Sequence, residues 1–483
     1  MADTQKPRDV DILIVGAGLS GIGAAYRFQT ECPTKTYEIL EGRDAIGGTW
    51  DLFRYPGIRS DSDMYTLGYP FRPWREAKAI ADGDDILAYV RSTAAEYGID
   101  RRIQYQHQVT AANWSTQESR WHVAVQTPQG QVEYVCQFLY LCCGYYDYRA
   151  GHDAGIPGLA DFQGEVVHPQ FWPDELDYQD KDVVVIGSGA TAVTLVPALA
   201  PNAKHVTMLQ RSPTYIVNRP SKDSISDFLR DKLPERRAHG LARWKNILTT
   251  TAFYRFCRRF PDQARKLLLA GVRQELPDGY DVEKNFNPTY QPWDERLCLV
   301  PDGDLFQSLT SGKADVVTDH IERVTGTGIQ LRSGASLPAD IVITATGLKI
   351  RVGGGIEVSV DGQLLDIGDV LVYRGVMLSG VPNLGWCVGY TNASWTLRTD
   401  ISTRFFCRLI NRMDVAGYAQ ATPTPPADVD PQPLIDLTSG YLQRAKDELP
   451  KQGSRAPWYL RQDYVLDSAS LKFAKLDKDM AFR

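Results

Sequence analysis

The sequence lacks the features of a metalloprotein and of a nucleic-acid-binding protein. None of its eight cysteines forms a Cys-x-x-Cys pair, and its seven histidines do not group at metal-ligand spacing. Positive charge is not in excess either: the net charge is −6, whereas proteins that bind phosphate backbones have basic surfaces. We therefore expect no metal site and no nucleic-acid partner.

A long hydrophobic run is also missing. The longest apolar stretch, Val183 to Ala200, contains Gly187, Gly189 and Pro197, which is typical of a strand, a turn and a helix start. The first ten residues are polar and of mixed charge, unlike a signal peptide. Free thiols in a reducing compartment are expected. The sequence thus predicts a cytoplasmic protein without a transmembrane segment, and leaves open a peripheral contact with a membrane.

A glycine motif between a strand and a helix is present near the N-terminus. The apolar run Asp11 to Val15 is typical of a buried parallel strand, and it leads into Gly16-Ala-Gly-Leu-Ser-Gly21 and a helix over 22–30. In this pattern the first glycine makes a tight turn, the second admits a pyrophosphate, and the third lets helix and strand pack closely. The next strand, 37–40, leads to Glu41, where an acid accepts hydrogen bonds from a ribose. The site suits FAD or NAD.

The same pattern recurs in the middle of the chain. A strand over 183–186 leads into Gly187-Ser-Gly-Ala-Thr-Ala192, a helix to residue 200 and a strand over 206–209. Arg211 follows that strand in place of an acid, and an arginine can pair bidentately with the adenosine 2′-phosphate that an acid would repel. This second site suits NADP.

Two such units predict an α/β fold with two doubly wound, Rossmann-like dinucleotide-binding domains. Strands over 137–144 and 340–347 are expected to complete the two sheets. We expect the first part of an FAD-binding domain at 1–150, an NADP-binding domain at 151–345, and a return to the FAD-binding domain with a C-terminal tail at 346–483.

A helical insertion in the second domain is predicted over about 221–285. It is rich in arginine and lysine, and it places Leu241, Trp244, Leu248 and Ala252 at helical spacing. We expect a solvated helix packed on the core, with a face for a membrane surface as the alternative. The Pro-rich stretch from Ala421 to Pro433 predicts a loop.

Two cofactor sites in one chain indicate that electrons pass between two cofactors and on to an acceptor. A flavin disulfide reductase would need a redox cysteine pair a few residues apart beside the flavin. Adjacent Cys142 and Cys143 lie at a strand end and are poorly placed for that role. Oxygen or an acceptor protein therefore remains as the electron acceptor.

A third motif carries a family resemblance. Phe162-Gln-Gly-Glu-Val-Val-His-Pro-Gln-Phe-Trp172-Pro fits the Phe-x-Gly-x-x-x-His-x-x-x-Trp-Pro/Asp fingerprint of type I Baeyer–Villiger monooxygenases, just before the second glycine motif as in that family. Segments 47–50, 54–61 and 345–347 also resemble it. Within the family the chain is similar, nearly end to end, to the ethionamide-activating monooxygenases, including segments 389–395 and 449–455.

The resemblance implies an enzyme that uses NADPH, FAD and O2 to oxygenate ketones to esters, and thioethers or thioamides to S-oxides, through a C4a-peroxyflavin. Arg296 aligns with the family's catalytic arginine, and Asp61 would keep it placed and charged. His168 would have a hinge or positioning role. The FAD contacts implied are Gly16, Gly18, Ser20, Gly21, Glu41, Thr49, Trp50, Asp51, Leu52, Asp61 and Val109. The NADP contacts implied are Arg59, Ser60, Asp61, Gly187, Ser188, Gly189, Ala190, Thr191, Ala192, Val193, Arg211 and Ser212.

One position departs from the family pattern. Typical ketone-oxidising members carry lysine just before the catalytic arginine, where it helps to hold the 2′-phosphate, and this chain has Glu295. NADPH selectivity is then expected to depend mainly on Arg211. Two alternatives stay open: a flavin monooxygenase restricted to N- or S-oxygenation, and a flavin electron-transfer reductase. The natural substrate and the oligomeric state are likewise open.

Overall fold

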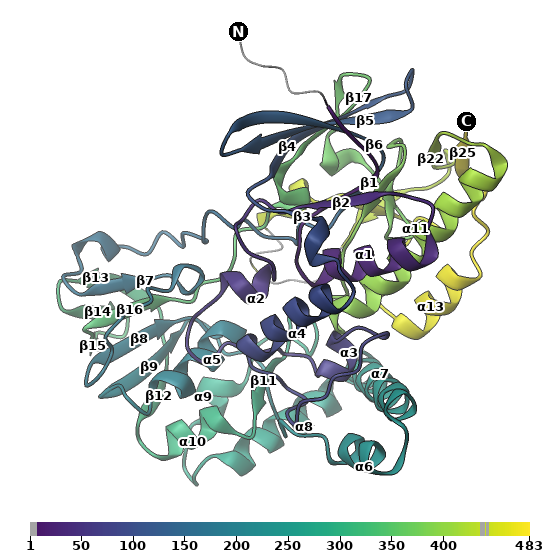
Figure 1. Cartoon of the computed structure of the whole chain (residues 1–483). Helices are drawn as coiled ribbons and strands as arrows, with labels where there is room; N and C mark the ends of the chain where they lie inside the picture. Colours follow the sequence, from purple (N-terminus) through teal and green to yellow (C-terminus); the bar gives the residue numbers. More distant parts are fainter. Residues whose placement is uncertain (1–6, 435–439, 441–443) are drawn as a thin grey trace.

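Two sheets built from distant parts of the chain form the frame of the molecule (Figure 1). The computed structural model describes residues 7–434, 440 and 444–483. The first sheet has the order β18-β17-β4-β5-β6-β1-β2-β3, with β21 also paired to β6. Its strands are β1 (Arg8–Val15), β2 (Tyr37–Leu40), β3 (Ile103–Gln104), β4 (Gln108–Ser115), β5 (Arg120–Thr127), β6 (Gly130–Leu141), β17 (Glu357–Val360), β18 (Gln363–Leu364) and β21 (Leu384–Trp386).

The strands around β1 are parallel and buried on both faces. Ile12 and Ile14 face one core, which includes α1 (Leu19–Glu31) and α11 (Trp395–Ala416), while Leu13 and Val15 face another. A continuous apolar run is what two buried faces require. α1 and α11 lie side by side although they are almost 400 residues apart in the chain (Figure 1).

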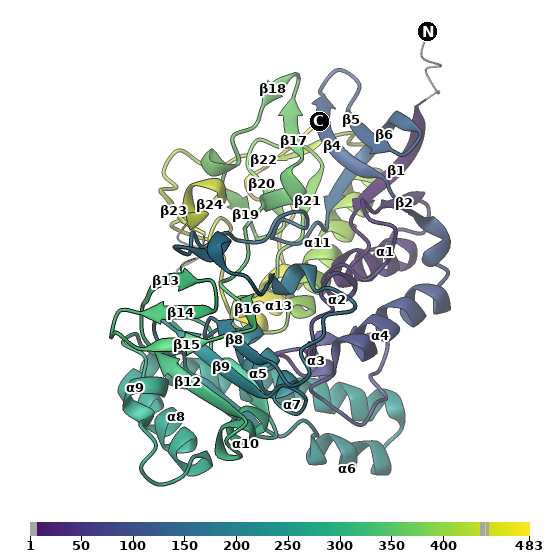
Figure 2. The same cartoon turned by 90° about the vertical axis from the view of Figure 1, so that its left-hand side faces the viewer.

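The second sheet is fully parallel, in the order β12-β9-β8-β16-β7. It consists of β7 (Glu165–Val167), β8 (Asp182–Ile186), β9 (His205–Gln210), β12 (Ala314–Thr318) and β16 (Ile341–Thr344), with α5 (Ala190–Leu199) and α10 (Asp304–Thr310) packed against each other. A three-stranded antiparallel sheet, β13 (Ile321–Thr325), β14 (Gly328–Leu331) and β15 (Ser336–Pro338), lies beside it (Figure 2).

The inserted segment is helical, as predicted. It contains α6 (Ser224–Lys232), α7 (Glu235–Arg259), α8 (Pro261–Glu275) and α9 (Val282–Phe286), and it lies between the paired strands β10 (Ile216–Arg219) and β11 (Cys298–Pro301). The predicted α/β fold, with two doubly wound domains and a helical insertion in the second, is confirmed.

The remaining elements belong to the first half and to the tail. The short helices α2 (Thr49–Leu52) and α3 (Met64–Leu67) and the longer α4 (Gly83–Glu96) follow the first glycine motif, and α13 (Tyr464–Lys472) packs on α11. The strand pairs are β19 (Val372–Tyr373) with β20 (Met377–Leu378), β22 (Ala421–Pro423) with β25 (Met480–Phe482), and β23 (Pro431–Pro433) with β24 (Lys451–Gly453).

Three local predictions need correction. The strand expected at 137–144 is longer and ends earlier, at Leu141, because the chain turns away towards the second domain there. The Pro-rich stretch is not only a loop, since β22 and β23 pair with the C-terminal segment. Leu241, Trp244 and Leu248 do not pack on the core: they are 52%, 46% and 53% exposed. Across the part of the chain that is described, none of the helices combines the length and apolarity needed to cross a bilayer.

Candidate functional site

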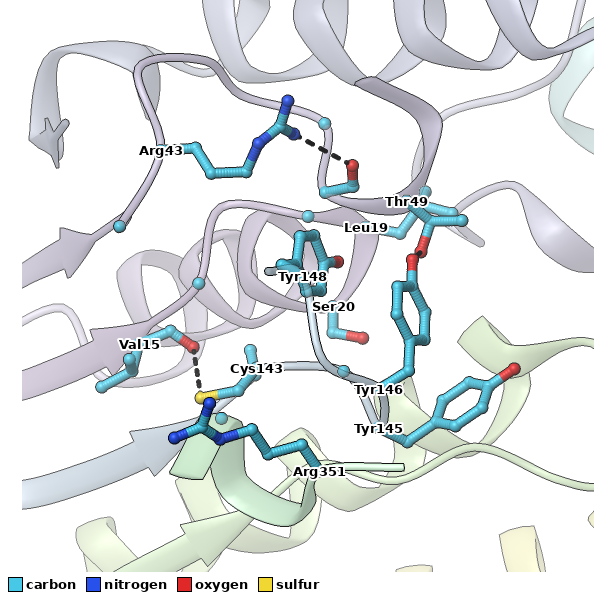
Figure 3. Close-up of a pocket in the computed structure, with 18 of the residues that line it drawn as sticks. Val15, Leu19, Ser20, Arg43, Thr49, Cys143, Tyr145, Tyr146, Tyr148 and Arg351 are labelled. Atoms are coloured by element: carbon cyan, nitrogen blue, oxygen red, sulfur yellow. Dashed lines mark hydrogen bonds between the residues drawn. The ribbon is translucent and has the colours of Figure 1, made fainter. Parts of the chain in front are cut away.

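A cavity of about 500 Å³ opens at the carboxyl ends of β1 and β6 (Figure 3). Parallel sheets bind ligands at this edge, where neighbouring strands end together. The structure brings eleven of the predicted site residues to the cavity wall. They are Gly16, Gly18, Ser20, Glu41, Thr49, Trp50, Arg59, Ser60, Asp61, Val109 and Arg296.

The first glycine motif has the geometry of a phosphate cradle. Gly16 has φ +105°, and a Cβ there would lie 2.5 Å from the Cys142 carbonyl oxygen. A Cβ on Gly21 would lie 1.8 Å from the Gly16 carbonyl oxygen, so this glycine allows α1 to pack against the turn. Among the described residues no side chain caps the start of α1, and its first turn has no acid. Its first backbone N–H groups are therefore available to an anion.

Glu41 stands beside this cradle. It is 8% exposed, and its carboxylate accepts hydrogen bonds from the amides of Ala17 at 2.8 Å and Arg43 at 2.9 Å. Burial raises the pKa of Glu41, and the two amides oppose that rise. A buried, oriented carboxylate next to a glycine turn suits the hydroxyl groups of a ribose.

An aromatic wall completes the cavity, and its tyrosines were not among the predicted site residues. Tyr146 bonds to the Thr49 hydroxyl at 2.7 Å and stacks on Tyr148, with ring centroids 4.9 Å apart (Figure 3). Tyr145 stacks on Trp395, whose indole N–H donates to Ser20 Oγ at 2.9 Å. The tyrosines directly follow β6, next to β1, so their position after a predicted strand was a usable signal.

Opposite charges meet at one part of the wall. Asp61 lies in the fields of Arg296 and Arg59; burial raises the pKa of Asp61, and the two arginines oppose that rise. Arg59 in turn pairs with Asp304 at the start of α10. The predicted partnership of Asp61 with Arg296 is thus reflected in their placement, because both reach the cavity from segments more than 200 residues apart.

The second glycine motif forms a separate cradle outside the lining of the cavity. Gly187 has φ +143°, and a Cβ there would lie 2.3 Å from the Ala345 carbonyl oxygen. A Cβ on Gly189 would meet no described atom within 4 Å. As in α1, no described side chain caps α5 and its first turn has no acid. Residues Ser188, Ala190, Thr191, Ala192 and Val193 continue this turn into α5.

Arg211 and Ser212 are exposed just beyond β9, at the same sheet edge. Glu295 lies close enough to Arg211 for the two charges to interact: burial raises the pKa of Glu295, and Arg211 opposes that rise. The departure from the family pattern therefore places an acid beside the arginine expected to hold the 2′-phosphate.

A short segment connects the two cradles. Tyr55 lies beside Thr191 of α5, and burial raises the pKa of Tyr55 to about 12. Gly57 has φ +76°, and a Cβ there would lie 2.7 Å from the Ala198 Cβ of α5. Since Arg59 to Asp61 follow directly, this contact positions the charged part of the cavity against the second cradle.

Some predicted residues lie elsewhere. Asp51 is buried in ion pairs with Arg43 at 2.8 Å and Arg91 at 3.0 Å, and Leu52 packs against the core of the second domain. Gly21 lies beneath the turn. Conversely, Cys142 and Cys143 both line the cavity, although they were predicted to be poorly placed for a redox pair beside the flavin. Burial raises the pKa of Cys143 to about 12, which disfavours a reactive thiolate.

The Phe162–Pro173 fingerprint lies where the chain crosses between the domains. Its His168 ring is against Gly151, on which a Cβ would lie 2.5 Å from the ring, and Gln170 donates to the Asp147 carbonyl oxygen at 2.7 Å. Burial lowers the pKa of His168. This packed histidine is outside the lining of the cavity, and its expected hinge or positioning role stays a prediction.

A small apolar pocket of about 60 Å³ adjoins the main cavity and shares Tyr145, Arg296, Tyr390 and Trp395 with it. The rest of its wall is mostly aliphatic or aromatic, including Ile350 and Trp386. Arg296 is its one charged lining residue in the described part of the chain.

Comparisons with known proteins agree with this arrangement. Residues 67–251 match the family model described as flavin-binding monooxygenase-like, and residues 14–81 match an NAD(P)-binding Rossmann-like domain. The FAD-containing monooxygenase EthA of Mycobacterium tuberculosis is 55% identical over 97% of this chain and 96% of its own length. The putative FAD-containing monooxygenase MymA of the same organism is 50% identical over 95% and 94%.

Solved structures show the same fold. An oxidized steroid monooxygenase bound to NADP superposes with a TM-score of 0.76 at 21% identity, covering 98% of this chain and 99% of the other. An open structure of cyclohexanone monooxygenase gives a TM-score of 0.77 at 19% identity, covering 99% and 100%. On these full-length relatives the chain belongs to the FAD-containing monooxygenases, in the group of EthA, and its motifs resemble those of the type I Baeyer–Villiger family.

Proposed function

We propose that FAD binds in the main cavity and NADPH at the second cradle, and that the joint site oxygenates small ketones and thioethers. One observation carries the proposal: Asp61 and Arg296 lie together in the cavity that starts at the first glycine turn. The residues present fit both cofactors, because each cradle offers a strained glycine turn and an uncapped helix start.

FAD, when bound, supplies the route for electrons from NADPH to O2. The diphosphate would lie on the start of α1, with Glu41 on the ribose. The 2′-phosphate of NADPH would lie on Arg211 and Ser212, and its diphosphate on the start of α5. Tyr55 and Gly57 hold the two cradles in register, which is a positioning role.

Arg296 provides fixed positive charge where negative charge develops on a reacting oxygen. Asp61 keeps that guanidinium oriented. The stacked aromatic rings of Tyr145 and Trp395 would exclude water from the same region, which limits the release of activated oxygen as H2O2 before it reaches the substrate.

The adjoining apolar pocket supports an uncharged substrate. Its wall offers hydrocarbon surface to an alkyl chain, while Arg296 lies at the point shared with the main cavity. A ketone oxygen or a thioether sulfur placed there would meet the positive charge directly. We propose action in the cytoplasm, consistent with eight cysteines that form no disulfide.

The test is to incubate purified protein with NADPH, labelled O2 and a panel of ketones, thioethers and amines. Mass spectrometry of the products then shows whether they contain labelled oxygen. One labelled oxygen atom in esters and sulfoxides is expected without any added protein. Products from amines or sulfur compounds alone would indicate the restricted flavin monooxygenase. NADPH consumption that requires an acceptor protein, with no label in any product, would overturn the proposal.

A further inference from the structure

The long helix α7 carries an apolar stripe on its outer face. Leu241, Trp244 and Leu248 follow one another at helical spacing, and about half of each side chain is exposed. Burial of α7 uses the opposite face, which includes Ala242, Asn246 and Ile247. Large apolar side chains in a row on one exposed face are characteristic of an interaction surface.

The charges around this stripe have one sign. After Glu235 at its start, α7 contains no acid, and exposed Arg237 and Arg259 lie on the same face at its two ends. Residues 221–276 contain 13 lysines and arginines against 6 acids, in a chain with a net charge of −6. The insertion is therefore a basic region on an acidic protein.

Acids from neighbouring elements neutralise some of these cations. Asp463 pairs with Arg255 beside α13, Asp223 pairs with Lys245 beside α6, and Asp294 pairs with Arg258. Arg255 lies on the face of the stripe, two turns beyond Leu248, so its pair with Asp463 belongs to that face. Lys245 and Arg258 lie to either side of the stripe, and Arg237 and Arg259 at its two ends remain exposed. The surface thus keeps an apolar centre between basic ends.

We propose that the outer face of α7 docks the enzyme on an anionic lipid surface, with Leu241, Trp244 and Leu248 inserted at the headgroup level. A helix that lies in a membrane interface combines leucine and tryptophan on one side with arginine at the flanks, and it needs no spanning length. A symmetric pairing of two copies through this face would set basic ends against basic ends, so charge complementarity favours an anionic lipid surface over such a dimer. The neighbouring helix α6, which packs against α7, also exposes the apolar side chains of Ile225 and Phe228.

The inner face of the same helix reaches the wall of the cavity. Ile247 packs with Tyr390, which lines both pockets, and Arg243 donates to the carbonyl oxygens of Tyr65 at 2.7 Å and Gly68 at 2.8 Å. One helix thus separates the proposed lipid surface from the cavity. Docking would bring apolar compounds dissolved in the lipid close to the site.

The experiment is co-sedimentation of the FAD-loaded protein with vesicles of phosphatidylcholine containing about one third phosphatidylglycerol. We expect binding that falls with added salt and is much weaker on pure phosphatidylcholine. Arg237→Gln with Arg259→Gln should weaken binding about 25-fold, since each basic residue near such a surface contributes roughly fivefold. Trp244→Ser with Leu248→Ser should weaken it by at least about tenfold.

Val415→Ser is the matched control, because Val415 is 92% exposed on α11 and should not affect binding. All variants should keep their FAD and their activity on a water-soluble substrate, which excludes unfolding. Vesicle binding that is unchanged in both α7 variants would overturn the proposal. So would self-association in sedimentation velocity that the α7 variants abolish, since the stripe would then be an interface between copies. Neither result bears on the oxygenation reaction.

Discussion

At the scale of single residues, Arg296 and Asp61 place opposite charges side by side in the cavity. Burial raises the pKa of Asp61, so its charged form is costly to the fold, and the field of Arg296 offsets part of that cost. In the proposed function the pair would also separate two half-reactions, because reduction of the flavin needs stacked rings and oxygen transfer needs the positive charge.

In Arg296→Ala, NADPH should therefore still reduce the flavin, while the rate of product formation falls by a factor of about 10²–10³. The reduced enzyme should then release H2O2 in place of oxygenated product. Arg296→Lys should restore little, because a point charge on a flexible stem does not replace a planar guanidinium. Stopped-flow absorbance and product yield measure the two steps. A normal yield from the alanine variant would rule Arg296 out as the catalytic residue.

The pair Arg211 and Glu295 makes the choice of cofactor testable. A charge-assisted hydrogen bond contributes about 1.5–3 kcal/mol, and Glu295 should reduce this to the lower half, about tenfold to 40-fold in affinity. Arg211→Ala should raise KM for NADPH and leave KM for NADH nearly unchanged, whereas Glu295→Gln should lower KM for NADPH. Equal changes with both cofactors would refute the assignment.

The same pair gives a pH dependence. Burial raises the pKa of Glu295, so its carboxylate is neutralised as the pH falls through that raised value, and its repulsion of the 2′-phosphate disappears. The affinity gap between wild type and Glu295→Gln for NADPH should therefore narrow towards acidic pH. Because the free cofactor titrates identically in both measurements, any difference between the two proteins arises from Glu295 and its interaction with the bound phosphate.

At the scale of elements, the two glycines of the turn before α5 have different roles, one in folding and one in cofactor binding. A Cβ on Gly187 would collide with the Ala345 carbonyl oxygen, whereas a Cβ on Gly189 would meet open space in the described structure. Gly187→Ala should lower the thermal midpoint. Gly189→Ala should keep the midpoint and the FAD content, yet raise KM for NADPH, because the second glycine lets a pyrophosphate approach. A normal KM in the Gly189 variant would place the diphosphate elsewhere.

The helices α11 and α13 are joined by a buried ion pair. Arg398, 2% exposed, donates to Asp467 at 2.6 Å, and Tyr390 donates to the same carboxylate at 2.9 Å. Asp467→Ala should destabilise the protein by about 3–5 kcal/mol, because it leaves a buried guanidinium without its partner. Arg398→Met combined with Asp467→Leu should recover much of that loss. Urea unfolding measures both, and equal losses in the single and double variants would contradict the account.

At the scale of the whole molecule, local patterns predicted the two dinucleotide-binding units well. β2 spans 37–40 as predicted, and β8 and β9 differ from the prediction by single residues, because buried parallel strands and glycine turns are specified by neighbouring residues. The position of Tyr145 after a predicted strand was a usable signal. Its stacking on Trp395 and the approach of Tyr55 to Thr191 are long-range contacts, which no local pattern encodes. The outward stripe of α7 was misjudged for a related reason: helical spacing shows that a face is apolar, but not what covers it. The domain limits near 150 and 345 stay predictions.

The uncapped start of α1 has a consequence for the life of the protein in a cell. The chain leaves its first backbone N–H groups to be satisfied by a phosphate from outside, so the fold is completed by its flavin. A ligand that binds only the folded state adds about 2.7 kcal/mol when present at one hundred times its dissociation constant. In a cell poor in flavin, a larger fraction of the protein would therefore be unfolded and would be degraded by proteases. Nutrient supply would thus set how much enzyme accumulates, before any regulation of its gene.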